Sequence, residues 1–99
     1  MITEIAFIEV APENHAAFEA AVARGVNEVI ATAAGFIDFT LVKGIEQANV
    51  YSFQIHWETL EHHTVGFRES ELFPAWRAIV AEFFARPPQI DHWTPVFSV

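Results

Sequence analysis

The chain has 99 residues, of which 53% are hydrophobic and 14% aromatic, and its formal net charge is −8. This length predicts one domain built around one core. Because thirteen acidic residues outnumber five scattered basic ones, we expect neither nucleic acid nor a membrane surface as a partner. Cysteine is absent, which excludes disulfides and thiolate chemistry. So many aromatic residues in a small domain suggest a surface covered by a second subunit or a ligand pocket.

The N-terminal stretch MITEIAFIEV lacks the basic region of a signal peptide and contains the acidic residue Glu4. No apolar run reaches the roughly 18 residues that a membrane-spanning helix needs. We therefore expect a cytoplasmic protein.

The first half of the chain predicts a strand, a helix and a hairpin. Residues 2–10 are rich in Ile, Val and Phe and end before Pro12, which predicts a strand. Residues 12–35 carry apolar side chains at helical spacing and end at Gly35, a residue typical of helix C-termini. Residues 36–43 and 50–58 alternate as strands do, and the polar residues 44–49 between them predict a loop. In the first of these strands, the alternation places four side chains on one face: Phe36, Asp38, Thr40 and Val42. In the second strand, the four side chains that share a face are Tyr51, Phe53, Ile55 and Trp57.

The second half predicts a helix in two pieces and a last strand. Thr59 is a suitable N-cap for a helix over residues 60–69, and Ser70 is suitable for another over 72–85. Residues 90–99 predict a strand in which Pro95 indicates a sheet edge or an arm. The order β-α-β-β-α-β predicts an α+β, ferredoxin-like fold with a four-stranded antiparallel sheet and a split second helix, in one domain over residues 1–99. Because helices cover only one face of such a sheet, we expect a homodimer formed through the other face and the C-terminal strand.

Three segments carry a resemblance to a known family: AGFIDFTLVKG, VYSFQIHW and ETLEHHTVGFRESELFPAW. Their layout resembles the antibiotic biosynthesis monooxygenase (ABM) family, which has a dimeric α+β-barrel fold, and the resemblance covers nearly the whole chain. The family's glycine before the second strand, tryptophan ending the third, histidine after it and serine before the next helix correspond to Gly35, Trp57, His63 and Ser70. The resemblance implies a homodimeric oxygenase that uses no metal or flavin cofactor. Its substrate would be a small aromatic or polyketide-type molecule, bound between helices and sheet.

In such oxygenases, a deprotonated electron-rich ring passes an electron to oxygen itself. The protein binds the ring, helps to remove a proton and excludes water. Members that act on polyketide quinones use two asparagines, one on the first strand and one on the third. At the corresponding positions this chain has Ala6 (or a neighbour) and Phe53, so both asparagines are missing. It also lacks the residues of the haem-degrading members. These departures leave two alternatives, a non-catalytic dimeric protein that binds small molecules and a cyclase or isomerase with the same fold.

His63 and Trp57 are the candidate catalytic residues. His63 shares a helical face with Leu60 and Phe67, which predicts that it points inward. It would accept a proton or a hydrogen bond, while Trp57 would form the pocket wall. The alternative is a structural histidine bonded to a backbone carbonyl or a hydroxyl. Four aromatic residues are candidates for substrate binding, although for most of them packing in the core is the stronger expectation, because a domain of this size needs them there (Phe67, Phe73, Trp76 and Phe83).

We expect no metal site, because the neighbouring residues His62 and His63 diverge by about 100° on a helix. His56 lies on the strand face opposite Trp57, which predicts a position in the dimer interface or on the surface. The remaining histidines are expected as follows: His15 and His62 exposed, and either His92 or its neighbour Trp93 facing the helices.

Overall fold

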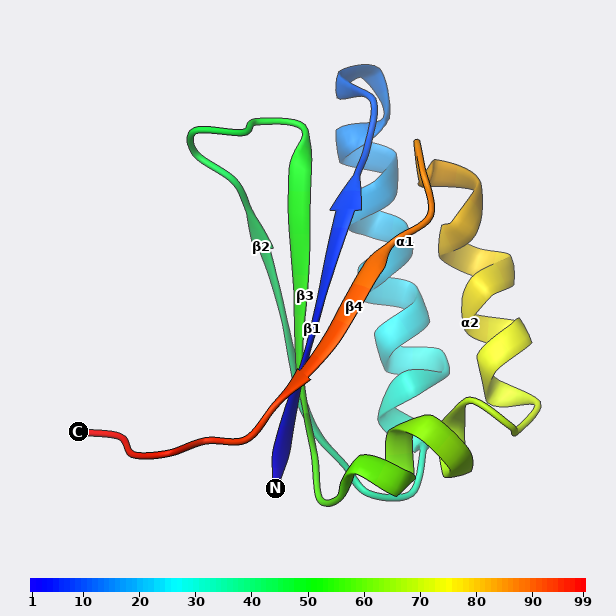
Figure 1. The fold of residues 1–99 in the computed structure, drawn as a ribbon. Coiled ribbons are helices and arrows are strands. Elements are labelled where there is room, and N and C mark those ends of the chain that lie inside the picture. Colours follow the sequence, from blue (N-terminus) through cyan, green and yellow to red (C-terminus); the bar gives the residue numbers. More distant parts are fainter.

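Four strands form one antiparallel sheet, and two helices cover one of its faces (Figure 1). The computed structural model describes all 99 residues. Its main elements are β1 (Ile2–Glu9), α1 (His15–Glu28), β2 (Phe36–Lys43), β3 (Val50–Trp57), a π-helical segment (His62–Phe67), α2 (Leu72–Val80) and β4 (Gln89–Trp93). The strand order is β2-β3-β1-β4. This arrangement confirms the predicted ferredoxin-like α+β fold, including the split of the second helix.

The core lies between the helices and the inner face of the sheet. All four residues predicted on one face of β3 are buried there (Tyr51, Phe53, Ile55 and Trp57). Phe18 and Val22 of α1 and Trp76 of α2 pack into the same cluster. Gly25 lets α1 and α2 approach closely, because a Cβ atom at this position would lie 2.7 Å from Cζ3 of Trp76.

The predicted alternation of β2 is wrong at its start. Phe36 pairs with Trp57 and Asp38 pairs with His56, so Ile37 is an extra residue in the register. Such a β-bulge reverses the faces that follow it. Phe36 therefore turns inward and packs edge-on against Trp57 at a centroid distance of 6.1 Å, whereas Asp38 is exposed.

Both predicted capping residues form side-chain hydrogen bonds at the start of the helical segments, but the N-cap position of α2 is Glu71 rather than Ser70, and the last two elements end earlier than predicted. The Oγ1 atom of Thr59 accepts a hydrogen bond from the His62 amide at 3.2 Å, and the Oγ atom of Ser70 accepts one from the Leu72 amide at 3.1 Å. The helix predicted over 72–85 becomes a 3₁₀ turn after Val80. The last strand ends at Trp93, and residues 94–99 form an extended arm that leaves the sheet (Figure 1).

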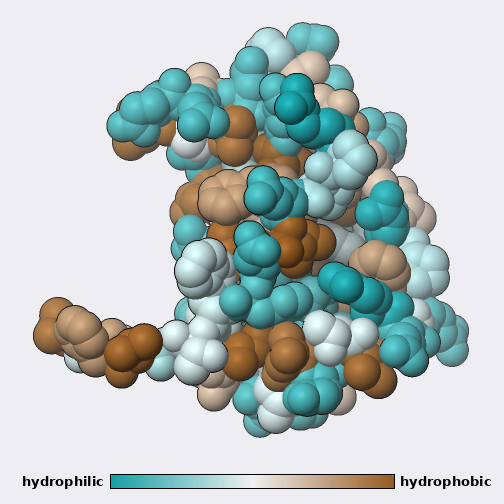
Figure 2. Space-filling model, in the orientation of Figure 1, coloured by the Kyte–Doolittle hydropathy of each residue, from teal (hydrophilic) through white to brown (hydrophobic).

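No element covers the outer face of the sheet. Its exposed apolar side chains include Phe7, Val42 and Trp93, which are 49%, 38% and 55% exposed. The C-terminal arm projects from the body and carries hydrophobic side chains (Figure 2), among them Val96 and Phe97. These surfaces are the ones through which the sequence predicts a dimer. No helix has the length and apolar character that crossing a bilayer requires.

Candidate functional site

A carboxyl group is buried on the inner face of the sheet, where β1 pairs with both of its neighbours. Glu4 of β1 lies opposite Ile55 in β3 and opposite His92 in β4, and it is only 5% exposed. Its Oε1 atom accepts a hydrogen bond of 2.9 Å from Nε1 of Trp57 and lies 3.3 Å from Nε2 of His63. Glu4 thus joins the two residues predicted to be catalytic.

The sequence interpretation missed Glu4, although a signal was present. In the strand ITEIAFIE, Glu4 alternates with Ala6 and Ile8, so all three side chains share one face. Ala6 and Ile8 are each 1% exposed and belong to the core. An acidic residue in step with two core residues predicts a buried carboxyl group, and buried ionisable groups gather at functional sites.

His63 is held among aromatic rings at the start of the π-helical segment. Its imidazole stacks against the indole of Trp57 at a centroid distance of 5.4 Å and an interplanar angle of 19°. It also stacks against Phe67 at 6.1 Å. The His63 carbonyl accepts a hydrogen bond of 3.0 Å from the amide of Arg68, five residues later in the chain. This residue spacing defines a π turn, and π turns are frequent at functional sites. His63 is 2% exposed, so it points inward as predicted.

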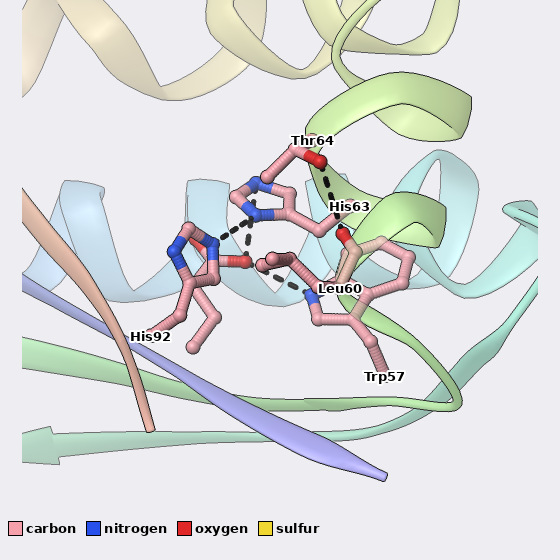
Figure 3. A network of polar contacts seen from close by, with 6 residues as sticks. Trp57, Leu60, His63, Thr64 and His92 are labelled. Carbon is pink, nitrogen blue, oxygen red and sulfur yellow. Dashed lines mark hydrogen bonds and ion pairs between the residues drawn. The ribbon is translucent and has the colours of Figure 1, made fainter. Parts of the chain in front are cut away.

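Both ring nitrogens of His63 face ionisable side chains. Nε2 faces Glu4, and Nδ1 forms a hydrogen bond of 2.8 Å with Nε2 of His92. The alternative of a structural histidine bonded to a backbone carbonyl or a hydroxyl therefore does not describe this contact pattern. Figure 3 shows Trp57, His63 and His92 converging from the end of β3, the helical segment and β4. Of the two neighbours at the end of β4, His92 faces the helices, and Trp93 is turned outward.

The three ionisable groups of this network have shifted pKa values. Burial raises the pKa of Glu4 from 4.5 to about 7, although the Trp57 hydrogen bond and the positive charge of Arg68 oppose the rise. Burial, with help from Arg68 and His92, lowers the pKa of His63 to about 3. The pKa of His92 is also lowered, by burial and by Arg68, with Asp91 opposing.

These shifts assign different roles to the two partners of the 3.3 Å contact. At neutral pH His63 is uncharged, so its contact with Glu4 is not an ion pair. A group with a pKa near 7 gains and loses a proton readily at neutral pH, whereas His63 is too weakly basic to hold one. The best proton acceptor of the site is therefore Glu4, and His63 is its neutral neighbour.

A narrow cavity leads to this network. Its polar end is formed by Glu4, Trp57 and His63, and most of its remaining lining is apolar. The cavity volume is about 50 Å³. Among the lining residues, Arg77 is exposed, and its guanidinium lies 6.0 Å from the ring centre of Phe73 and 5.9 Å from that of Phe84. The mouth therefore combines aromatic surface with one positive charge.

Three of the four predicted substrate-binding residues line the cavity: Phe67, Phe73 and Trp76. Phe83 lies outside it and packs edge-on against Phe18 at 6.0 Å, and Phe84 lines the cavity instead. Phe84 takes the place of Phe83 because the chain forms a 3₁₀ turn after Val80. Successive side chains in such a turn are rotated further from one another than in an α-helix.

The other histidines lie apart from the cavity. His56 is on the outer face, where its Nδ1 atom lies 2.6 Å from Oδ1 of Asp38. His15 and His62 are half-buried, so the expectation that they are exposed is wrong. His15 bonds the Val10 carbonyl, and His62 packs over Gly35. No three His, Asp or Glu side chains are placed to hold a metal ion together.

Comparisons with known proteins agree with this fold. The family model described as "Antibiotic biosynthesis monooxygenase" matches residues 1–79. The uncharacterised Bacillus subtilis (strain 168) protein YczJ is 32% identical over 96 residues, which cover 97% of this chain and all of that protein. A crystal structure from Bordetella bronchiseptica, of a protein that carries the same family name, is 41% identical, with a TM-score of 0.90 and 97% of both chains covered. A mutant of SnoaB, a cofactor-independent oxygenase from Streptomyces nogalater, has a TM-score of 0.81 over 99% of this chain and 95% of its own, but its 17% identity shows a shared fold alone.

Proposed function

Because the chain belongs to the antibiotic biosynthesis monooxygenase family, we propose that it is a cofactor-independent monooxygenase acting on a small aromatic or polyketide-type substrate. The observation that carries the proposal is the position of Glu4, a buried carboxyl group with a pKa of about 7 at the end of a mostly aromatic cavity. SnoaB, which shares the fold, is named a cofactor-independent oxygenase, and this supports the reaction class.

The reaction that suits this site converts an acidic methylene group next to a ring into a carbonyl, as in an anthrone. The carboxylate of Glu4 takes one proton, and the electron pair stays on the substrate carbon. The resulting carbanion gives one electron to O₂, and the radical pair combines into a peroxide, which is then protonated. Loss of the second C–H proton and cleavage of the O–O bond release water and leave the carbonyl. One oxygen atom enters the product, the other leaves as water, and the substrate supplies all the electrons.

The neighbours of Glu4 would prepare it for this step. The Trp57 N–H donates to the carboxylate and keeps the pKa of Glu4 from rising further. His63, neutral and stacked on Trp57, holds the carboxyl group from the helical side. The proposal thus keeps both predicted catalytic residues but moves the role of proton acceptor from His63 to Glu4. Phe67, Phe73 and Trp76 would form the apolar walls against the substrate ring.

Substrate entry requires the cavity to widen. An enclosed volume of about 50 Å³ is smaller than the roughly 150 Å³ cavity that accommodates benzene. Phe73 and Phe84 are half-buried cavity residues near Arg77, so their side chains are the ones expected to move outward. The narrow resting cavity also favours a second candidate, a protein that binds a small ligand without turning it over.

Oxygen uptake with a panel of anthrones and hydroquinones tests the proposal. The matched pair of variants is Glu4→Gln and Glu9→Gln, which make the same change on the inner and outer faces of one strand. We expect uptake by the wild type and by Glu9→Gln, and only background uptake by Glu4→Gln. Substrate loss without oxygen uptake would support a cyclase or isomerase, and saturable binding without any reaction would support the binding protein. Full activity in Glu4→Gln would refute Glu4 as the base.

We further propose that the protein is a homodimer formed through the outer sheet face and the C-terminal arm. Phe7 and Trp93 are exposed on that face, and the arm carries Phe97 at 84% exposure. Apolar surface of this kind is expected to be covered by a partner.

A further inference from the structure

His92 links the buried Glu4–His63 pair to the outside of the domain. Glu4 and His63 are only 5% and 2% exposed, whereas His92 is partly exposed. The contacts are continuous, with 3.3 Å between Glu4 and His63 and 2.8 Å between His63 and His92. The mechanism proposed above gives His92 no task, and a substrate in the cavity would block the other route from Glu4 to water.

We propose that His63 and His92 form a two-imidazole relay through which Glu4 exchanges its proton with solvent while the cavity mouth is occupied. The relay rests on the proposed function for its purpose. Its proton movement is a property of the substrate-free protein and can be measured without any reaction.

The proton movement balances along the chain of contacts. With Glu4 protonated, its hydroxyl faces Nε2 of His63, the Nδ1–H of His63 donates to Nε2 of His92, and the Nδ1–H of His92 faces outward. A shift of one proton at each contact leaves Glu4 ionised and releases one proton to water. After the shift, the Nε2–H of His63 faces the carboxylate, and the Nε2–H of His92 donates to Nδ1 of His63. The reverse shift brings one proton inward.

The surrounding charges suit this task. Arg68 follows the helical segment and acts on all three groups, and Asp91 lies beside His92 in β4. Burial and the positive charge of Arg68 keep both imidazoles neutral, as their lowered pKa values show. A neutral imidazole has one N–H donor and one acceptor nitrogen, so it can pass a proton on without holding a charge.

The test is the exchange rate between water and the ring N–H proton of His63, measured by magnetisation transfer on protein labelled with ¹⁵N-histidine. His92→Phe keeps an aromatic ring but cannot carry a proton. His92→Gln keeps an N–H that can donate to His63, so it preserves a merely structural role, but it cannot carry a proton either. His56→Gln is the control, because His56 is a partly exposed histidine on the opposite sheet face, bonded to Asp38.

We expect exchange to slow by about tenfold or more in both His92 variants and to stay unchanged in His56→Gln. Wild-type exchange in His92→Gln would overturn the relay, and this variant decides the question if His92→Phe does not fold. Backbone amide spectra establish folding in each case. No substrate or oxygen enters this experiment, so a failed relay and a failed oxygenase give separate results. If the relay fails, proton exchange at His63 is unchanged in the His92 variants. If the oxygenase proposal fails, the wild type takes up no oxygen.

Discussion

Replacing Glu4 with glutamine should change how the stability of the protein depends on pH. Burial raises the pKa of Glu4 from 4.5 to about 7 in the folded state, so between these values the folded protein binds more protons than the unfolded chain. The Glu4 contribution to the unfolding free energy is therefore fully present below pH 4.5 and is lost as the pH rises through 7. Glutamine is nearly the same size, can accept the Trp57 hydrogen bond and does not titrate.

The two pKa values set the size of the effect. The separation between 4.5 and about 7 corresponds to about 3 kcal/mol of unfolding free energy at pH 8. His63 acts in the opposite sense, because its folded pKa of about 3 makes stability fall as the pH drops below 6.5. Since His63 is present in both proteins, subtracting one stability curve from the other isolates Glu4. The Glu4→Gln variant should thus gain about 3 kcal/mol relative to wild type between pH 4.5 and 8.

Urea unfolding at intervals across this pH range provides the assay, with Glu9→Gln as the control on the same strand. For Glu9→Gln we do not expect the unfolding free energy, relative to wild type, to rise by about 3 kcal/mol between pH 4.5 and 8. A Glu4→Gln curve that runs parallel to the wild-type curve would refute the reasoning, because it would mean that the Glu4 carboxyl group has an ordinary pKa.

Three further results are expected. Trp57→Phe removes the N–H donor to the carboxylate and should raise the pKa of Glu4 above about 7 in a ¹³C NMR titration; a lowered pKa would contradict the hydrogen bond. Gly35→Ala should lower the unfolding free energy in urea by more than about 1 kcal/mol, because φ is +81° and the new Cβ atom would lie 2.1 Å from Cγ of His62; wild-type stability would contradict this. Sedimentation should show a dimer at micromolar concentration and a shift toward monomer in Trp93→Lys; a stable wild-type monomer would rule out the proposed interface.

The order of elements could be predicted from sequence because its signals are local. Alternation along β3, the capping residues Thr59 and Ser70 and the polar loop over 44–49 each act within a few residues. The bulge at Ile37 could not be predicted in this way, since it is a property of the pairing between β2 and β3.

The geometry of the candidate site was predicted in part, because it depends on contacts between distant segments. Glu4 and His92 lie near opposite ends of the chain and become neighbours only when β1 pairs with β4. Helical spacing in the sequence predicted that His63 points inward. The same spacing could not predict that the pKa of His63 is lowered. Burial and Arg68 lower the pKa of His63, while burial raises that of Glu4, and neither environment can be seen in the sequence.

The central claim, that Glu4 accepts a proton from the substrate, is tested most directly without oxygen. Anthrone in anaerobic D₂O exchanges its acidic methylene protons for deuterium, and mass spectrometry follows this step apart from any oxidation. We predict that the wild type accelerates the exchange, that the rate rises with pH through about 7 as Glu4 ionises, and that Glu4→Gln falls to the background rate. Exchange by Glu4→Gln as fast as by the wild type would contradict the claim.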